Sequence, residues 1–193
     1  MTLAAFAAAA LSAQAAAVNW GIGADVYLAK VGEGYESAVL ASEASFAPAD
    51  GSYLALVYVG QNQDSFVLAN ITAESVVATS PFALDPYDGG CDWSPAEMTA
   101  DVTDTATYPD GASFAVVWFD KNTGAFDYIY SIDDGSALNS ATTFSDMTRG
   151  NDYATPAATT TGFGGVLYVT VPEPGIAAMA LIGLGMMIKR RRA

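Results

Sequence analysis

The chain has 193 residues, 52% of them hydrophobic, and its seven Lys or Arg against 21 Asp or Glu give a formal net charge of −14. An acidic surface of this kind repels phosphate backbones and argues against nucleic-acid binding. Histidine is absent and Cys91 is the only cysteine, so histidine-dependent triads, a zinc site and an intramolecular disulfide are excluded. We interpret Cys91 as a free or buried thiol.

The first segment, residues 1–17, is apolar, rich in Ala and ends in small residues, which is typical of a secretory signal peptide. The small-x-small rule predicts cleavage after Ala15 or Ala17. Removal of this segment and of the tail leaves residues 18–171, long enough for one domain with a sizeable core. That domain has three cations against 20 acids, a formal net charge of −17.

The last 22 residues combine three features in a fixed order. An uncharged apolar run, Gly175–Ile188, predicts a helix of about 21 Å, which is short of the roughly 30 Å hydrocarbon core and suits a transient anchor. A cationic flank stays on the cytoplasmic side, so everything before the run is expected outside the cytoplasm. The motif before the run is Pro172, Glu173 and Pro174, and the basic end after it is Lys189, Arg190, Arg191 and Arg192.

This order resembles the PEP-CTERM sorting signal of Gram-negative bacteria, also catalogued as the ice-binding protein C-terminal domain. The resemblance covers only residues 172–193 and the residue before them. It implies that an exosortase in the inner membrane recognises Pro172, Glu173 and Pro174 and removes the helix. The protein would then pass to the cell surface or the exopolysaccharide matrix. A tail anchor that is never cleaved is the alternative.

Between the two ends, short runs rich in Val, Tyr, Phe and Ala alternate with turn residues, which indicates strands. Both alternating faces are apolar in Tyr53–Val59 and in Ser113–Phe119, so we expect these to be central strands. The fold class predicted is all-β, a sandwich of about seven or eight antiparallel strands. The candidate strands are Asp25–Ala29, Ser37–Ala41, Tyr53–Val59, Ser65–Asn70, Ser75–Thr79, Ser113–Phe119, Phe126–Ile132 and Val166–Val171.

The two central segments also resemble each other. Residues 48–58 and 109–119 align at an offset of 61, and each is expected to continue through a turn into a second strand, containing Phe66 or Phe126. Two hairpins of one design, forming two halves of the sandwich, are one interpretation. Two unrelated hairpins of ordinary composition are the other.

Candidate ligand-binding residues cluster in one long loop between the central segments. Asp85, Asp88 and Asp92 offer oxygen ligands for calcium, with a plain acidic loop as the alternative. Tyr87 and Trp93 flank these acids, and aromatic rings beside carboxylates suit sugar stacking and hydrogen bonding. Two other acidic segments, Asp120–Gly124 and Asp133–Gly135, are predicted to be turns, and core packing accounts for Trp118, Tyr128 and Tyr130.

These residues predict a non-enzymatic exported protein of the cell surface or exopolysaccharide matrix, with no catalytic residue and no obligatory cofactor. A carbohydrate- or calcium-binding adhesin module is the main alternative. A small carboxylate-dependent hydrolase is a distant one, because paired acids suffice for glycoside hydrolysis but no pair stands out here.

Overall fold

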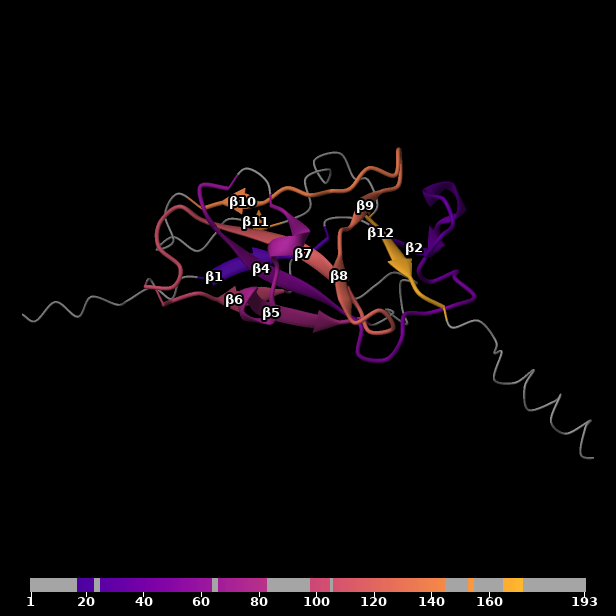
Figure 1. Ribbon diagram of the computed structural model, residues 1–193, viewed down its shortest axis with the longest axis horizontal. Coiled ribbons are helices and arrows are strands. Elements are labelled where there is room, and N and C mark those ends of the chain that lie inside the picture. The colour runs from indigo at the N-terminus through magenta and orange to yellow at the C-terminus, as the bar shows by residue number, and fades with distance from the viewer. Residues whose placement is uncertain are drawn as a thin grey trace, which may run out of the picture.

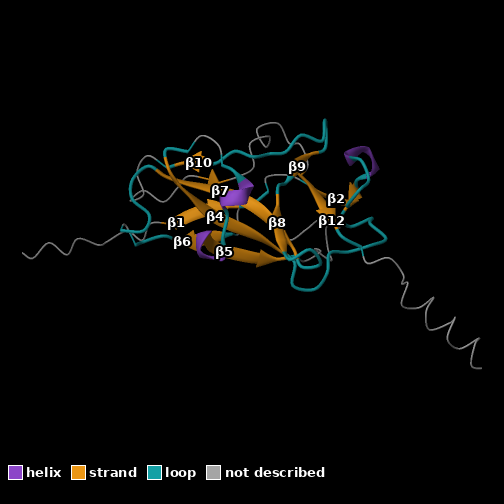
Figure 2. Ribbon diagram, viewed as in Figure 1, coloured by secondary structure: helices purple, strands orange, loops and turns teal. Residues whose placement is uncertain are grey.

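The computed structural model describes residues 17–22, 25–63, 66–82, 98–104, 106–144, 153–154 and 165–171. These parts form twelve strands and three short 3-10 turns (Figures 1 and 2), so the all-β prediction is confirmed. Within them, no helix has the length and apolar character needed to cross a membrane. The predicted sorting signal, residues 172–193, and the predicted signal peptide up to residue 16 lie outside the described residues.

The strands form three sheets. The central sheet has the order β10 (Thr142–Thr143), β7 (Ala112–Asp120), β4 (Tyr53–Gln61) and β5 (Val76–Pro81), with β8 (Ala125–Asp127) also paired to β7. The outer sheet has the order β3 (Val39–Leu40), β2 (Val26–Lys30), β12 (Gly165–Val169) and β9 (Tyr130–Ser131). The short sheet has the order β11 (Tyr153–Ala154), β1 (Ala17–Trp20) and β6 (Thr99–Asp101). The 3-10 turns are η1 (Tyr35–Ser37), η2 (Leu68–Asn70) and η3 (Ala73–Ser75).

Two strand pairings differ from the antiparallel arrangement predicted. β2 lies parallel to β12 and β1 lies parallel to β11, whereas the other pairs are antiparallel. Figure 1 shows the first of these pairs, which brings an early strand and the last strand together at one end of the molecule. β1 begins at Ala17, which is paired with Asp101. Cleavage after Ala15 would keep that pairing, whereas cleavage after Ala17 would remove it.

Most candidate strands are confirmed within a few residues, but two predictions are wrong. Ser65–Asn70 contains no strand among its described residues and ends in η2, because Phe66 is buried from an irregular connection rather than from a ladder. Phe126–Ile132 is divided between β8, which pairs with β7, and β9, which pairs with β12. An apolar run thus signals burial, but it does not by itself signal a strand.

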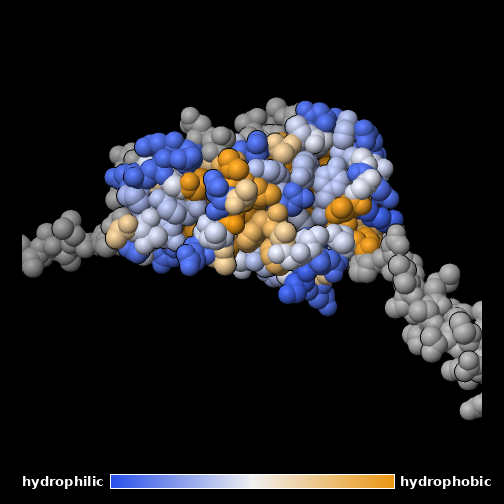
Figure 3. Space-filling view, viewed as in Figure 1, coloured by the Kyte–Doolittle hydropathy of each residue, from blue (hydrophilic) through white to orange (hydrophobic). Residues whose placement is uncertain are grey.

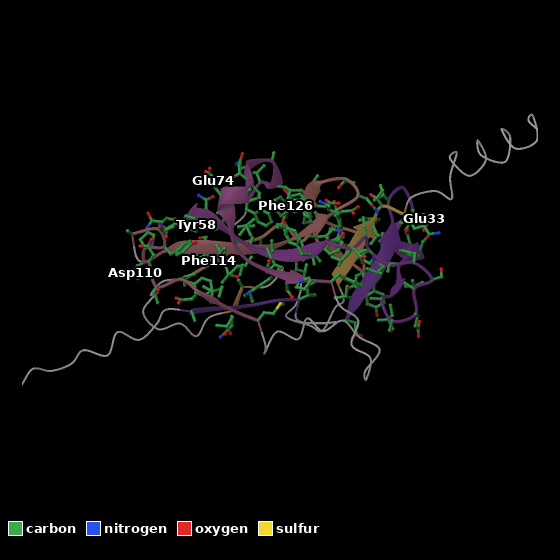
Figure 4. All side chains as sticks on the ribbon, turned by 90° about the horizontal axis from the view of Figure 1, so that it is seen from below. Glu33, Tyr58, Glu74, Asp110, Phe114 and Phe126 are labelled. Atoms are coloured by element: carbon green, nitrogen blue, oxygen red, sulfur yellow. The ribbon has the colours of Figure 1, made fainter. Side chains whose placement is uncertain are left out.

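The central strands are buried on both faces, as their composition predicts. Leu54 and Val116 belong to a first core cluster, and Ala55 and Val117 belong to a second. The first cluster receives side chains from all three sheets, among them Trp20, Leu28, Leu167 and Trp118. Figure 4 shows the separation of the two faces, with Phe114 and Phe126 on opposite sides of the central sheet.

The turns and strands of the two central segments correspond in structure at an offset of 60, rather than at the 61 expected, and whether they are a true repeat stays a prediction. Each strand follows a turn closed by a 2.9 Å backbone hydrogen bond, from Ser52 N to Ala49 O and from Ala112 N to Pro109 O. Gly51 and Gly111 hold the same position in the two turns, with φ of 89° and 84°, which only glycine adopts readily. Side chains in a strand alternate between the two faces of a sheet. An odd offset such as 61 would therefore match residues of one face in β4 with residues of the other face in β7.

The two central segments pair with each other within one sheet. Tyr53 lies opposite Phe119, Leu54 opposite Trp118, and the register continues to Tyr58 opposite Phe114. The expectation that they form two halves of a sandwich is therefore wrong. The second-strand expectation holds for Phe126, which lies in β8, and fails for Phe66, which lies in no strand.

A buried carboxylate joins the central sheet to the end of the outer sheet. Asp120 is 3% exposed, and its Oδ1 accepts a hydrogen bond from Asn122 N at 2.9 Å. Its Oδ2 accepts one from Thr170 N at 3.0 Å, directly after β12. Hydrogen bonds to a charged acceptor are stronger than those between neutral groups, so Asp120 stabilises the β7–β8 turn and the last described residues together.

We expect Asp120→Ala to lower the free energy of unfolding by about 2–3 kcal/mol, because two backbone N–H groups lose their acceptor. Asp120→Asn keeps one acceptor oxygen and should cost less. Urea unfolding followed by tryptophan fluorescence measures both variants. Equal unfolding midpoints for Asp120→Ala and the wild type would contradict this role.

Candidate functional site

The ligand-binding residues predicted from the sequence all lie outside the described residues. These are Asp85, Asp88, Asp92, Tyr87 and Trp93 in the loop, and the sorting motif and basic end in the tail. Calcium binding and sugar contact at that loop therefore stay predictions. The described residues on either side of the loop, Phe82 and Met98, both pack against the first core cluster.

The two acidic turns have the structures expected of them. Gly124 N donates to Asp120 O at 2.9 Å, and Gly135 N donates to Ser131 O at 3.0 Å. Both glycines have positive φ, 68° and 69°. Within the described parts of the chain, no group of three or more acids or cysteines could hold a metal ion.

The candidate site described here is on the second face of the central sheet. On this face the central strands carry small and β-branched side chains that are buried, Ala55 and Val57 from β4 and Ala115 and Val117 from β7. Among the described residues, the connection that follows β4 (residues 66–75) covers them, rather than another sheet. The site lies at the edge of this cover.

That connection is held down by one tyrosine. The backbone N–H of Leu68 donates to the Tyr128 hydroxyl at 2.8 Å, and the Tyr128 ring packs against Phe66 at 5.5 Å between centroids. Leu68 and Ile71 pack against the second core cluster from the same connection. Tyr128 is only partly buried, so core packing accounts for one side of its ring.

Three aromatic rings lie side by side across three adjacent strands. Tyr53 on β4 lies directly opposite Phe119 on β7, and Phe119 lies directly opposite Phe126 on β8. Residues directly opposite each other project on the same face, so the register brings these rings together. Tyr53 and Phe119 stack at 4.6 Å and 17°, and Phe126 lies edge-on to Phe119 at 5.3 Å and to Tyr53 at 6.3 Å. We call Tyr53, Phe119 and Phe126 the aromatic row.

Between the aromatic row and the connection lies a groove of about 1020 Å³. Figure 3 shows its surroundings as a hydrophobic patch in the middle of an otherwise largely hydrophilic face, where Figure 2 places two helical turns and β8. Every described residue that lines the groove is uncharged, although residues 18–171 carry a formal net charge of −17. The lining consists of Tyr53, Val67, Leu68, Ala69, Ile71, Thr72, Ala73, Val76, Phe119, Gly124, Ala125, Phe126 and Tyr128.

Tyr130 and Asp127 form a hydrogen-bonded pair directly after Phe126, the last member of the aromatic row. The Tyr130 hydroxyl donates to Asp127 Oδ1 at 2.8 Å, and the Tyr130 ring meets Tyr168 edge-on at 4.9 Å. Burial, and then the hydrogen bond to Asp127 and its negative charge, raise the pKa of Tyr130 well above its ordinary value. Burial and the charges of Glu36 and Asp127 also raise the pKa of Tyr168.

Comparisons of this chain with protein-family models, with curated proteins and with solved structures found no match. The groove itself can bind an apolar or amphipathic, uncharged ligand, because a concave surface with aromatic walls and few polar groups is the usual form of a binding site.

The sequence does not point to the aromatic row, because its members are 66 and seven residues apart along the chain, from Tyr53 to Phe119 and from Phe119 to Phe126. One signal is present. Phe119 and Phe126 flank a predicted hairpin turn, and placing them opposite each other would have indicated half of the row. Tyr53 joins them only through the pairing of β4 with β7.

We expect the free energy of unfolding to fall as pH rises above about 10, the ordinary tyrosine pKa. A raised pKa means that the folded state holds the phenol proton more tightly, so this stability is present below pH 10 and is lost as the pH approaches the pKa of Tyr130 in the folded protein. Tyr130→Phe should reduce the slope of stability against pH in that range. Asp127→Asn should bring the pKa of Tyr130 down in a spectroscopic titration of tyrosinate, with Tyr130→Phe identifying its signal. Identical titrations of Asp127→Asn and the wild type would contradict the pairing.

Proposed function

We propose that this chain is a non-enzymatic exported protein that binds neutral polysaccharide chains through the aromatic groove. The observation that carries the proposal is the uncharged lining of the groove, with three clustered aromatic rings, on a domain of net charge −17. Aromatic faces carry partial negative charge and attract the C–H groups of a sugar ring. Such a ligand needs no ion pair for binding.

The charge around the groove supports a neutral ligand over an acidic one. Glu74 is exposed, and its neighbour Ala73 lines the groove. Figure 4 shows Glu74 on the same side of the central sheet as Phe126. An anionic polymer or a second copy of this acidic domain would meet repulsion there, whereas a neutral glycan would not.

The architecture that supports this function is a two-layer sandwich. We propose that the central sheet forms one layer and that the outer and short sheets form the other, since all three contribute to the first core cluster. In that arrangement none of the described sheets lies opposite the second face of the central sheet, and it is the face that carries the groove.

We further propose that the tail acts as the PEP-CTERM signal that it resembles, with exosortase and the inner membrane as partners during sorting. The position of the last described residues supports this. Val171 packs against the first core cluster, and Thr170 is held by Asp120. Pro172 follows directly, so removal of the motif and the residues beyond it would leave these contacts in place.

We expect Phe126→Ala to weaken retention on a neutral polysaccharide about five- to tenfold, because loss of one stacked ring removes roughly 1 kcal/mol of binding free energy. Affinity electrophoresis in gels containing a neutral glucan measures this. Tyr108→Ala is the matched control, since Tyr108 packs on the first core cluster, away from the groove. Thermal unfolding first shows that both variants are folded.

Equal retention of Phe126→Ala and Tyr108→Ala would contradict binding at the groove. Trp93→Ala separates this proposal from binding at the Tyr87–Trp93 loop, because it should leave retention unchanged. Loss of retention in Trp93→Ala alone would favour the loop.

For the tail, mass spectrometry of surface material should find peptides up to the region of Val171 and none from residues 176–188. A variant with Pro172, Glu173 and Pro174 changed to Ala should remain in the membrane fraction with its tail intact. Recovery of intact tail peptides from the mature wild-type surface protein would show a tail anchor instead.

A further inference from the structure

A second, smaller hollow lies next to the groove on the same face. Its volume is about 310 Å³, and Val67 and Ile71 line both it and the groove. It differs in chemistry, because the polar residues Gln63, Asn70 and Ser75 belong to its lining. Among the described residues that line it, as among those of the groove, none is charged.

The shape of this hollow comes from an irregularity in β4. The register between β4 and β7 shifts between Tyr58 and Gly60, and Gly60 has a φ of 114°. A β-bulge bends its strand and re-aims the side chains beside it. A residue with a side chain is strained at that φ, so glycine maintains the bend that forms the wall of the hollow.

The polar groups of the hollow are carried on a fixed backbone. Gln63 N donates to Ser113 Oγ at 3.0 Å, and that hydroxyl also contacts Thr143 Oγ1 at 2.7 Å. Asn70 N donates to Val67 O at 3.0 Å, which closes the turn at η2. The hollow is therefore preformed, and a ligand would lose little free energy in ordering the backbone around it.

Val67 stands between the two hollows and is 59% exposed, the largest exposed fraction among the large hydrophobic residues of the described chain. A ligand that occupied both hollows would cover it. The face from Tyr53 to Gly60 extends over seven residues of β4, about 23 Å at roughly 3.3 Å per residue. That length accommodates several consecutive sugar units.

We propose that the groove and the second hollow are successive subsites of one cleft that binds the interior of a linear neutral glycan. This inference rests on the proposed function and adds the form of the ligand. Sugar rings stack on the aromatic row in the groove, and the next units donate and accept hydrogen bonds with the amides of Gln63 and Asn70. The cleft binds several consecutive sugar units within a glycan chain, rather than a single sugar or the end of a chain.

The test is calorimetric titration of the folded protein with neutral glucan oligosaccharides of increasing length, from disaccharide to octasaccharide, in both β-1,4- and β-1,3-linked series. Wild-type affinity should rise at least about tenfold with length in the series that binds. Asn70→Ala should weaken octasaccharide binding about three- to tenfold, the loss of one hydrogen bond, and leave disaccharide binding unchanged. Asn139→Ala, an exposed asparagine that lines neither hollow, is the control.

A second pair of variants tests the passage between the hollows. Val67→Lys should abolish the gain in affinity with length, because it places a long charged side chain on the path of the ligand. Val31→Lys should have no effect, and Val31 is a close match because it is 58% exposed. Both positions are at the surface, so neither variant should alter the melting temperature.

The outcomes separate the two proposals. Affinity independent of length, or Asn70→Ala matching Asn139→Ala, would overturn the two-subsite cleft while leaving the groove as a binding site. Failure of the wild type to bind any neutral oligosaccharide would overturn the proposed function. A wild-type dimer in sedimentation analysis that Val67→Lys converts to a monomer would show that a second copy occupies this face, and would overturn the cleft.

Discussion

The pairing of β4 with β7 is the constraint on which the rest of the structure depends. Both strands are apolar on both faces, so each face of the pair must be kept from water. One face carries the large rings of Phe114 and Trp118, and side chains from the short and outer sheets pack against it. The other face has smaller side chains on its central strands and is covered by the connection after β4 and by the rings of Phe126 and Tyr128. The fold thus has one thick core and one thin core.

The groove follows from that unequal cover. The connection from Phe66 to Ser75 is held at Tyr128 and Ile71 and does not reach across the whole sheet. The partly buried rings of the aromatic row remain beside the connection, and no described residue of the groove lining is charged. On a domain with this excess of acids, an uncharged apolar patch is the surface best suited to a ligand without charge.

The same pairing also explains why the two central segments differ in their surroundings. At an offset of 60, Leu54 corresponds to Phe114, and Ala55 corresponds to Ala115, so the faces of the two strands match in burial. The strands that follow them do not match. β5 pairs with β4 at five positions, whereas β8 pairs with β7 at three, after which the chain continues into the outer sheet. This departure leaves Tyr128 in the lining of the groove and places Tyr130 in the outer sheet, beside Tyr168.

The sequence by itself determined the acidity of the domain, the all-β class and the central strands, because composition and side-chain alternation are local properties. It misplaced Ser65–Asn70 because burial of Phe66 produces the same apolar pattern in a 3-10 connection as in a strand. The short strands β1, β6, β10 and β11 carry little pattern in two to four residues. Only the tertiary structure decided the aromatic row, since register between distant strands brings Tyr53 to Phe119, and pairing over such a separation is decided by the packing of whole faces.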